Sequence, residues 1–232
     1  MANFRKILAT LSTVAILSTL VVTTAVSAAG YTDVPSDSWA KSYVDNLVEL
    51  CVFTGEGKFR PADNMSRAEF VKSVVVAAGL EGTTAITFPD VKDGDWFAPY
   101  VKTAVANGVI GGYANGKFGP NDSLTREQAA KIVVKAFDLP EVTPTSPSFS
   151  DVKASDWSYG YVETLVSYGI VSGYGNGKFG PMDSVKRDQV AKIVSLALSP
   201  EAPVVDEDED EEVVVTGGDL GVMVSSETPA AV

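Results

Sequence analysis

Three arginines recur at matching positions of this chain and are its residues best suited to hold an anion. Arg67, Arg126 and Arg187 stand 59 and then 61 residues apart, each at the predicted start of a helix. A guanidinium matches a carboxylate with two parallel hydrogen bonds. The first helical turn adds unpaired backbone N–H groups and the positive end of the helix dipole. The three arginines are therefore candidate anion contacts, or alternatively partners in structural ion pairs with Glu69, Glu127 or nearby aspartates.

The composition excludes most catalytic chemistry. The 232 residues include no histidine and one cysteine, Cys51. Ser-His-Asp and Cys-His catalysis, His-based metal sites and an internal disulfide are therefore excluded. No pair of carboxylates stands apart from the repeated positions, as a glycosidase would need. We expect no catalytic residue, no metal and no cofactor, and we predict Cys51 to be a small core residue.

The acidity of the chain is concentrated at its C-terminal end. The formal net charge is −12, but from Glu201 onward there are ten acids and no bases, so residues 1–200 carry 20 acids against 18 bases. The nearly neutral body has no basic stripe, which argues against nucleic-acid binding. Seven consecutive acids at 206–212 predict a flexible, solvated spacer rather than a calcium-binding tail. We interpret 201–232 as this linker followed by the start of a β domain that the chain does not complete.

Residues 1–28 read as a secretory signal peptide. Arg5 and Lys6 precede an uncharged stretch, and Val26-Ser27-Ala28 fits a signal-peptidase site. The alternative is a retained membrane anchor, because the stretch is long enough to span a bilayer. Either interpretation puts the rest of the chain outside the cytoplasm.

Most of the remaining sequence is one unit repeated three times, at 29–84, 85–145 and 146–200. Each copy opens with aromatic-x-Asp-Val and a tryptophan, and continues through Gly-Lys-Phe-x-Pro to the arginine. The recurring residues are Asp33, Asp90 and Asp151, and Trp39, Trp96 and Trp157. The periodicity predicts an all-α fold in which each copy is a helix, a glycine-rich loop and a second helix. A helix pair this small cannot bury both faces alone, so the copies should pack into one body.

The expected helix ends follow from local signals. Ser36, Asp93 and Ser155 are candidate N-caps of the first helices, while Gly108 and Gly169 are candidate stops. Ser66 with Glu69, and Thr125 with Gln128, have capping-box spacing, whereas Lys186 in copy three should be capped elsewhere. The tryptophans fall on the apolar stripe of the first helices, which favours core positions over ligand contact. The three aspartates suit caps or turns as well as ligand contact.

These motifs together resemble the S-layer homology domain over roughly residues 30–198. That family's repeat opens with Phe-x-Asp-Val and a tryptophan helix, and it ends with a helix beginning Thr-Arg-Ala-Glu. Copy two supplies the pattern most fully, with Phe88, Asp90, Trp96, Gly108, Ile110, Gly112, Tyr113, Gly116, Phe118, Pro120, Thr125 and Arg126. The resemblance implies three copies around a pseudo-threefold axis, with grooves between neighbouring copies.

The resemblance also implies a function and a set of contacts. Such grooves hold secondary cell-wall polysaccharide, typically pyruvylated, or a peptidoglycan-linked polymer, without covalent attachment. The protein would then be secreted and held at the cell surface, either as a wall-anchoring module, as the front end of a larger self-assembling surface-layer protein, or as an anchoring subunit for an exported hydrolase. Transferred by position, the ligand contacts are Arg67, Arg126, Arg187, Asp33, Asp90, Asp151, Trp39, Trp96, Trp157, Gly111, Gly112 and Gly173.

Copy one departs from the pattern. Its loop reads Thr54-Gly55-Glu56-Gly57, two residues shorter than the loops of copies two and three, and lacks their Tyr-x-Asn segment. Copies two and three instead replace Thr-Arg-Ala-Glu with Thr-Arg-Glu-Gln and Lys-Arg-Asp-Gln. Not all three grooves need therefore be functional, and good halves of a groove could come from different copies.

Overall fold

The computed structural model describes residues 30–55 and 57–201. Within these ranges the chain forms helices, turns and isolated bridges but no strand, so the predicted all-α fold is confirmed. None of the helices described has the length and hydropathy needed to cross a bilayer. The predicted signal peptide at 1–28, the acidic run and the expected β-strand lie outside the described residues.

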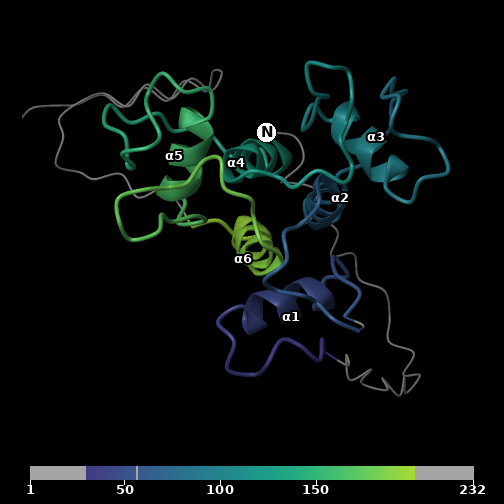
Figure 1. Ribbon diagram of the computed structural model, residues 1–232, viewed down its shortest axis with the longest axis horizontal. Helices are drawn as coiled ribbons and strands as arrows, with labels where there is room; N and C mark the ends of the chain where they lie inside the picture. The colour runs from purple at the N-terminus through teal and green to yellow at the C-terminus, as the bar shows by residue number, and fades with distance from the viewer. Residues whose placement is uncertain (1–29, 56, 202–232) are drawn as a thin grey trace, which may run out of the picture.

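Each copy contributes a short outer helix and a longer second helix. The outer helices are α1 (Lys41–Glu49), α3 (Ala98–Ala106) and α5 (Tyr159–Ser167). The second helices are α2 (Arg67–Ala77), α4 (Arg126–Ala136) and α6 (Arg187–Ala197). Figure 1 shows α2, α4 and α6 gathered around the centre with α1, α3 and α5 spread outside them, as three arms.

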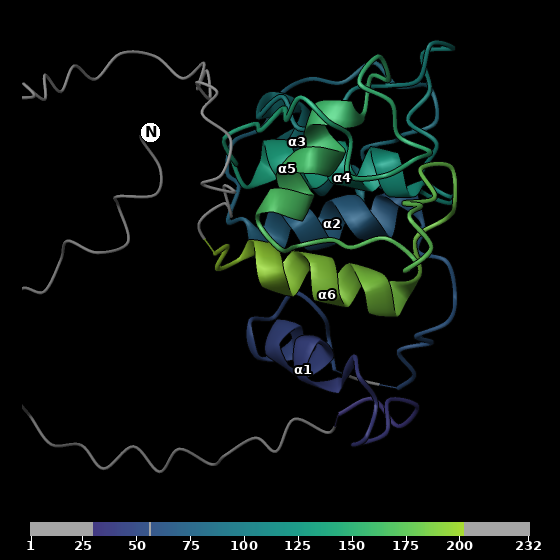
Figure 2. The ribbon, with the colours of Figure 1, turned by 90° about the vertical axis from the view of Figure 1, so that its left-hand side faces the viewer.

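Each outer helix packs on the second helix of the preceding copy. Helix α3 lies on α2 and α5 lies on α4, while α1 closes the ring by lying on α6 (Figures 1 and 2). The first and last copies are joined here by a hydrogen bond from the Asn46 side chain to Ser195 Oγ, 2.7 Å long. Every arm of the molecule therefore combines two copies.

The second helices form the centre because their apolar residues cover more than one face. In α2, for example, Ala68, Phe70, Val71, Val74 and Val75 are all buried. A helix that is apolar on several sides is stable only when neighbours surround it. The segments that lead into these helices meet as well: the Met65 N–H donates to the Val185 carbonyl (3.1 Å) and the Val185 N–H to that of Leu124 (2.9 Å).

The predicted starts of the second helices are confirmed. Complete capping boxes join Ser66 to Glu69 and Thr125 to Gln128. The Lys186 ammonium has no lone pair to accept a bond. Gln189 still accepts from the Lys186 N–H through Oε1 (3.0 Å), as in the other copies. Its own N–H cannot donate to the Lys186 side chain and donates to Asp188 Oδ1 instead (2.7 Å).

The predicted caps of the outer helices are wrong. Ser36, Asp93 and Ser155 do not cap, because the helices begin later, after Ala40, Phe97 and Ser158, and no side chain caps them. The position of these helix starts also explains why the tryptophans lie at the surface. Ala40, Phe97 and Ser158 turn inward, at 0, 9 and 1% exposure. The preceding residues Trp39, Trp96 and Trp157 face outward at 55, 55 and 53%, so their predicted core position is wrong too.

The ends of the outer helices require a left-handed residue. Gly108 and Gly169, the predicted stops, have φ of +67° and +65°. The same position in copy one is Cys51, with φ of +58° and an exposed side chain. The prediction that Cys51 is a core residue is therefore wrong. Helix α1 ends at Glu49, before Cys51, and Cys51 adopts a backbone conformation that disfavours any side chain with a Cβ.

Replacing Cys51 by glycine should stabilise the protein. Removing the Cβ relieves left-handed strain, and after the entropy cost of a glycine we expect a gain of about 0.5–1 kcal/mol in the free energy of unfolding. Urea denaturation of the full chain measures it. Cys51→Ala, which removes the thiol but keeps the Cβ, is the control and should give no gain. Equal stabilisation by both variants would show that the thiol, not the backbone, is responsible.

Candidate functional site: three grooves between the copies

The structure contains grooves in which three copies meet. Groove 3, of about 180 Å³, combines the copy-three loop 170–174 and α6 with Arg126 of copy two and Trp39 of copy one. Groove 1, of about 210 Å³, combines the copy-one residues 52–54 and α2 with Arg187 of copy three and Trp96 of copy two. The expectation that one groove takes its parts from different copies is confirmed.

Residues equivalent to those that line grooves 1 and 3 also surround α4, and we call their position groove 2. Arg67 of copy one lies in the copy-two loop, where its Nη2 donates to the Gly111 carbonyl at 3.0 Å. Trp157 of copy three lies 5.7 Å from the Lys131 ammonium of α4. Each groove therefore takes its arginine from the preceding copy, its loop and helix from one copy, and its tryptophan from the following copy.

The arginines form the floor of the grooves. Arg126 is 7% exposed and donates from Nε to the Phe179 carbonyl (2.8 Å) and from Nη2 to the Ser172 carbonyl (3.0 Å). Its guanidinium lies over the rings of Tyr174 and Phe179, at 4.9 and 4.3 Å. Arg67 is 6% exposed and lies over the matching rings of copy two. These contacts make both arginines structural, while Arg126 still lines groove 3.

Burial acts on the charge of these arginines without removing it. Desolvation lowers the pKa of Arg67 and Arg126, although nearby tyrosine and aspartate side chains work against that shift. An arginine side chain nevertheless stays protonated at neutral pH. The floors of grooves 2 and 3 are thus cationic in a poorly hydrated position, where an anion is attracted more strongly than in water.

The helix starts do not offer free N–H groups to an anion, contrary to the sequence-based expectation. The N–H groups of Arg126 and Glu127 donate to the Asp183 and Pro181 carbonyls, at 2.9 and 3.1 Å. The Gln128 N–H donates to its Thr125 cap at 3.3 Å. The first three donors of the helix are therefore used within the protein.

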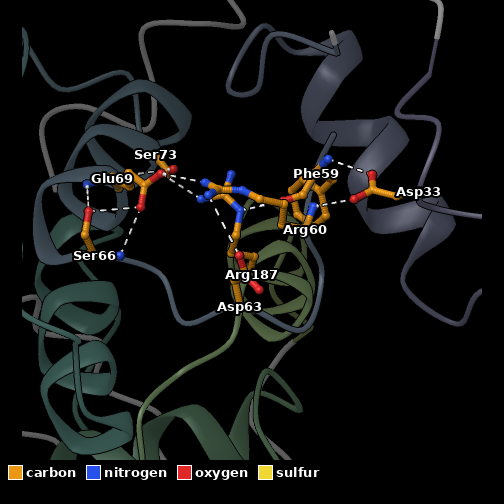
Figure 3. Close-up of polar contacts among 8 residues, drawn as sticks. All are labelled: Asp33, Phe59, Arg60, Asp63, Ser66, Glu69, Ser73 and Arg187. Atoms are coloured by element: carbon orange, nitrogen blue, oxygen red, sulfur yellow. Dashed lines mark hydrogen bonds and ion pairs between the residues drawn. The ribbon is translucent and has the colours of Figure 1, made fainter. Parts of the chain in front are cut away.

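The recurring aspartates fasten each loop from behind. Asp90 accepts from the N–H groups of Phe118 and Gly119 at 2.9 and 2.8 Å, and Asp151 makes the equivalent pair. In copy one, Asp33 accepts from Phe59 and Arg60 at 2.7 and 2.8 Å (Figure 3). Desolvation tends to raise the pKa of these carboxyls, but the backbone hydrogen bonds together outweigh it and lower their pKa.

Two of the three glycines expected to contact the ligand, Gly112 and Gly173, make room for protein rather than for sugar. A Cβ on Gly112 would meet the Phe88 ring at 2.6 Å, and one on Gly173 would meet Phe149 at 2.5 Å. Gly111 faces open space, which agrees with serine at the equivalent position 172. Gly112 and Gly173 are thus required by packing, and the ligand contact at Gly111 stays a prediction.

A recurring lysine was missed from the sequence. Lys72 and Lys192 line grooves 1 and 3, and Lys131 holds the same position in α4. Each stands five residues after its repeat's arginine, a spacing visible in the sequence. Within residues 30–55 and 57–201 none of the three has a carboxylate within ion-pair distance. Each groove therefore pairs an exposed tryptophan with a lysine.

The S-layer homology domain is matched at residues 30–71, 87–130 and 148–191. The chain is 34% identical to the surface-layer 125 kDa protein of Lysinibacillus sphaericus over 84% of this chain and 17% of that protein. It is 31% identical to a cellulosome-anchoring protein of Acetivibrio thermocellus over 61% of this chain and 34% of the relative. It is also 32% identical to an amylopullulanase of Thermoanaerobacterium thermosulfurigenes, over 68% of this chain and 9% of that enzyme.

A ring of three interlocked helix pairs with grooves between them defines a repeat-built binding domain. The chain belongs to the S-layer homology family. It is therefore a secreted protein of the cell surface, and domains of this family bind cell-wall polymers. The chain spans well under half the length of these curated relatives, which carry the domain as one part of a larger protein.

The aspartate contacts predict acid sensitivity. Because the folded pKa of Asp33, Asp90 and Asp151 is lowered, their stabilisation is complete above the ordinary value of 3.8 and is lost as the pH falls through the lowered values. Asp90→Asn should cost about 1–3 kcal/mol at pH 7, since hydrogen bonds to a charged group are lost, and should flatten the acid dependence. Denaturant titrations from pH 7 to 2 measure both effects.

Asp37→Asn is the matched control. Asp37 is exposed and has no hydrogen bond or ion pair to the residues that the structure describes. Its replacement should leave the stability profile unchanged. An Asp90→Asn profile that coincides with that of Asp37→Asn would contradict a stabilising role for the carboxylate.

Proposed function

We propose that this protein anchors itself, and whatever chain it is joined to, to the cell wall by holding pyruvylated wall polysaccharide in its grooves. The observation that carries the proposal is the pairing of an exposed tryptophan with a lysine in each groove, above an arginine that is buried in grooves 2 and 3 and partly buried in groove 1. A tryptophan ring gives a flat apolar surface for the face of a sugar. A ketal-linked pyruvate adds a carboxylate, which lysine and arginine attract.

The contacts have separate roles in this proposal. Lysine supplies a cation that pairs with no carboxylate among residues 30–55 and 57–201, and tryptophan supplies the stacking surface. Arg126 contributes through the edge of the guanidinium that faces groove 3, since Nε and Nη2 are already bonded to carbonyls. The aspartates and Gly112 and Gly173 act indirectly, by fixing the shape of the loop. The domain carries no catalytic chemistry of its own.

The relatives support two settings for the same anchoring role. A surface-layer relative favours a chain that is the front end of a larger protein assembling with copies of itself. A cellulosome-anchoring relative and an amylopullulanase favour a domain that fixes an exported hydrolase to the wall. Recovery of a hydrolase with the protein from the cell surface would support the second setting against the first.

Binding to purified wall polymer tests the proposal. The full chain should be retained by native polymer and released when the pyruvyl groups are removed. Lys192→Gln should weaken retention about three- to tenfold, equivalent to about 0.7–1.4 kcal/mol, because it removes the lysine cation that lines groove 3. Equal retention on both polymers would overturn carboxylate recognition.

Lys153→Gln is the matched control. Lys153 is exposed, lies outside the grooves and keeps only its backbone contact to Asp156. It carries the same charge change as Lys192→Gln. If both variants bind equally, the lysine of groove 3 is not a ligand contact.

A further inference from the structure

The three grooves differ in the residue at the third position of the second helix. Gln128 and Gln189 are neutral and use Oε1 to accept from the N–H of their N-cap residues, at 3.3 and 3.0 Å. In copy one the residue is Glu69. Its Oε2 accepts from the Ser66 N–H and hydroxyl at 3.0 and 2.9 Å, which frees Oε1 to face the groove.

Glu69 Oε1 is occupied by the groove's own arginine. Arg187 Nη1 donates to it at 2.8 Å, and Arg60 Nη2 lies 3.9 Å away (Figure 3). In the other copies a guanidinium Nη2 donates instead to a loop carbonyl, at Gly111 or Ser172, whereas Arg187 donates to a loop carbonyl only through Nε, to Phe59 at 2.6 Å. Neither Arg67 nor Arg126 has a carboxylate within 4 Å in the part of the chain that the structure describes.

The short loop of copy one explains this exchange. Grooves 2 and 3 cover their arginines with Tyr113 and Tyr174, each 4.9 Å from the guanidinium. Copy one lacks both the tyrosine and two loop residues, so that Arg187 stacks on Phe59 alone, at 5.2 Å. Glu69 takes the freed space. Hydrogen bonds from Ser66 and the charge of Arg187 together overcome the effect of burial and lower the pKa of Glu69, so it stays ionised at neutral pH.

We propose that groove 1 does not take the carboxylate-bearing sugar and instead binds a neutral sugar of the same polymer. This rests on the proposed anchoring function. The fixed carboxylate stands where a ligand carboxylate would approach Arg187 and repels it, while it accepts hydrogen bonds from sugar hydroxyls. Val52, Phe53 and Met65 also line this groove, and Trp96 supplies a stacking face. Glu69 is thus the residue that sets groove specificity.

The chain provides one reporter for each groove. It contains three tryptophans, and Trp96, Trp157 and Trp39 belong to grooves 1, 2 and 3. Their indole N–H resonances, assigned with single Trp→Phe variants, can be followed separately by NMR in the ¹⁵N-labelled full chain. The probes are a methyl hexoside carrying a pyruvate ketal and the same hexoside without the ketal.

With the acidic probe we expect the Trp39 and Trp157 resonances to shift while Trp96 stays still, and with the neutral probe we expect Trp96 to shift. Glu69→Gln should make Trp96 respond to the acidic probe, with affinity improved about tenfold, equivalent to about 1.4 kcal/mol. The variant keeps its helix start, because glutamine serves the same cap in copies two and three. The reciprocal control, Gln128→Glu, should weaken the Trp157 response by the same factor.

The outcomes separate this inference from the proposed function. A wild-type Trp96 that responds to the acidic probe as strongly as Trp39 would overturn the inference and leave anchoring intact. So would a Glu69→Gln variant whose Trp96 stays still while Trp39 responds, or a neutral probe that leaves Trp96 unmoved. If no tryptophan responds to the acidic probe in either protein, carboxylate recognition itself is refuted.

Discussion

The structure depends on one repeated set of backbone hydrogen bonds, in which the turn of one copy caps the central helix of the copy before it. The N–H groups of Arg67 and Ala68 donate to the carbonyls of Asp122 and Pro120, at 2.9 and 3.0 Å. Equivalent pairs seat α4 in copy three and α6 in copy one, where the Arg187 N–H donates to the Asp63 carbonyl at 2.9 Å. The first donors of a helix have no partner within it. Here the neighbouring copy supplies the carbonyl acceptors for these donors, so the three copies stabilise one another in a closed ring.

This mutual capping determines which residues remain for binding. Because the arginine follows the cap directly, its side chain enters the neighbour's loop and is largely consumed there by carbonyls and aromatic rings. Asp90 and its counterparts use their carboxylate oxygens to accept hydrogen bonds from backbone N–H groups of the same loop. The tryptophan and the lysine take no part in these contacts. The tryptophan precedes its outer helix, and the lysine lies more than one turn beyond the arginine in the second helix. In groove 3 the floor is therefore an arginine already bonded within the protein, and Trp39 and Lys192 are the side chains left to contact a ligand.

Copy one shows how far the repeat tolerates change. It holds Cys51 and Arg60 in left-handed conformations, at φ of +58° each, where the other copies have glycine. Its loop lacks a tyrosine, and Tyr31 compensates by accepting from the Gly55 N–H at 3.1 Å. The mutual capping persists nevertheless, since it uses backbone groups that any sequence supplies. The side chains around the groove are free to differ, which is how one fold can present unlike grooves.

The sequence alone determined the features that depend on near neighbours. The repeat period, the helix type, the capping boxes at Ser66 and Thr125 and the glycine stops all follow from patterns within a few residues. It misplaced Trp39 and Cys51, because α1 begins after Ala40 rather than after Ser36 and ends at Glu49, which leaves both residues outside the helix and its buried face. Only the tertiary structure decided that α3 packs on α2 and that α1 closes on α6. Three nearly equivalent copies present the same apolar faces, so the local pattern cannot distinguish partners, and the groove is fixed only when long-range packing closes the ring.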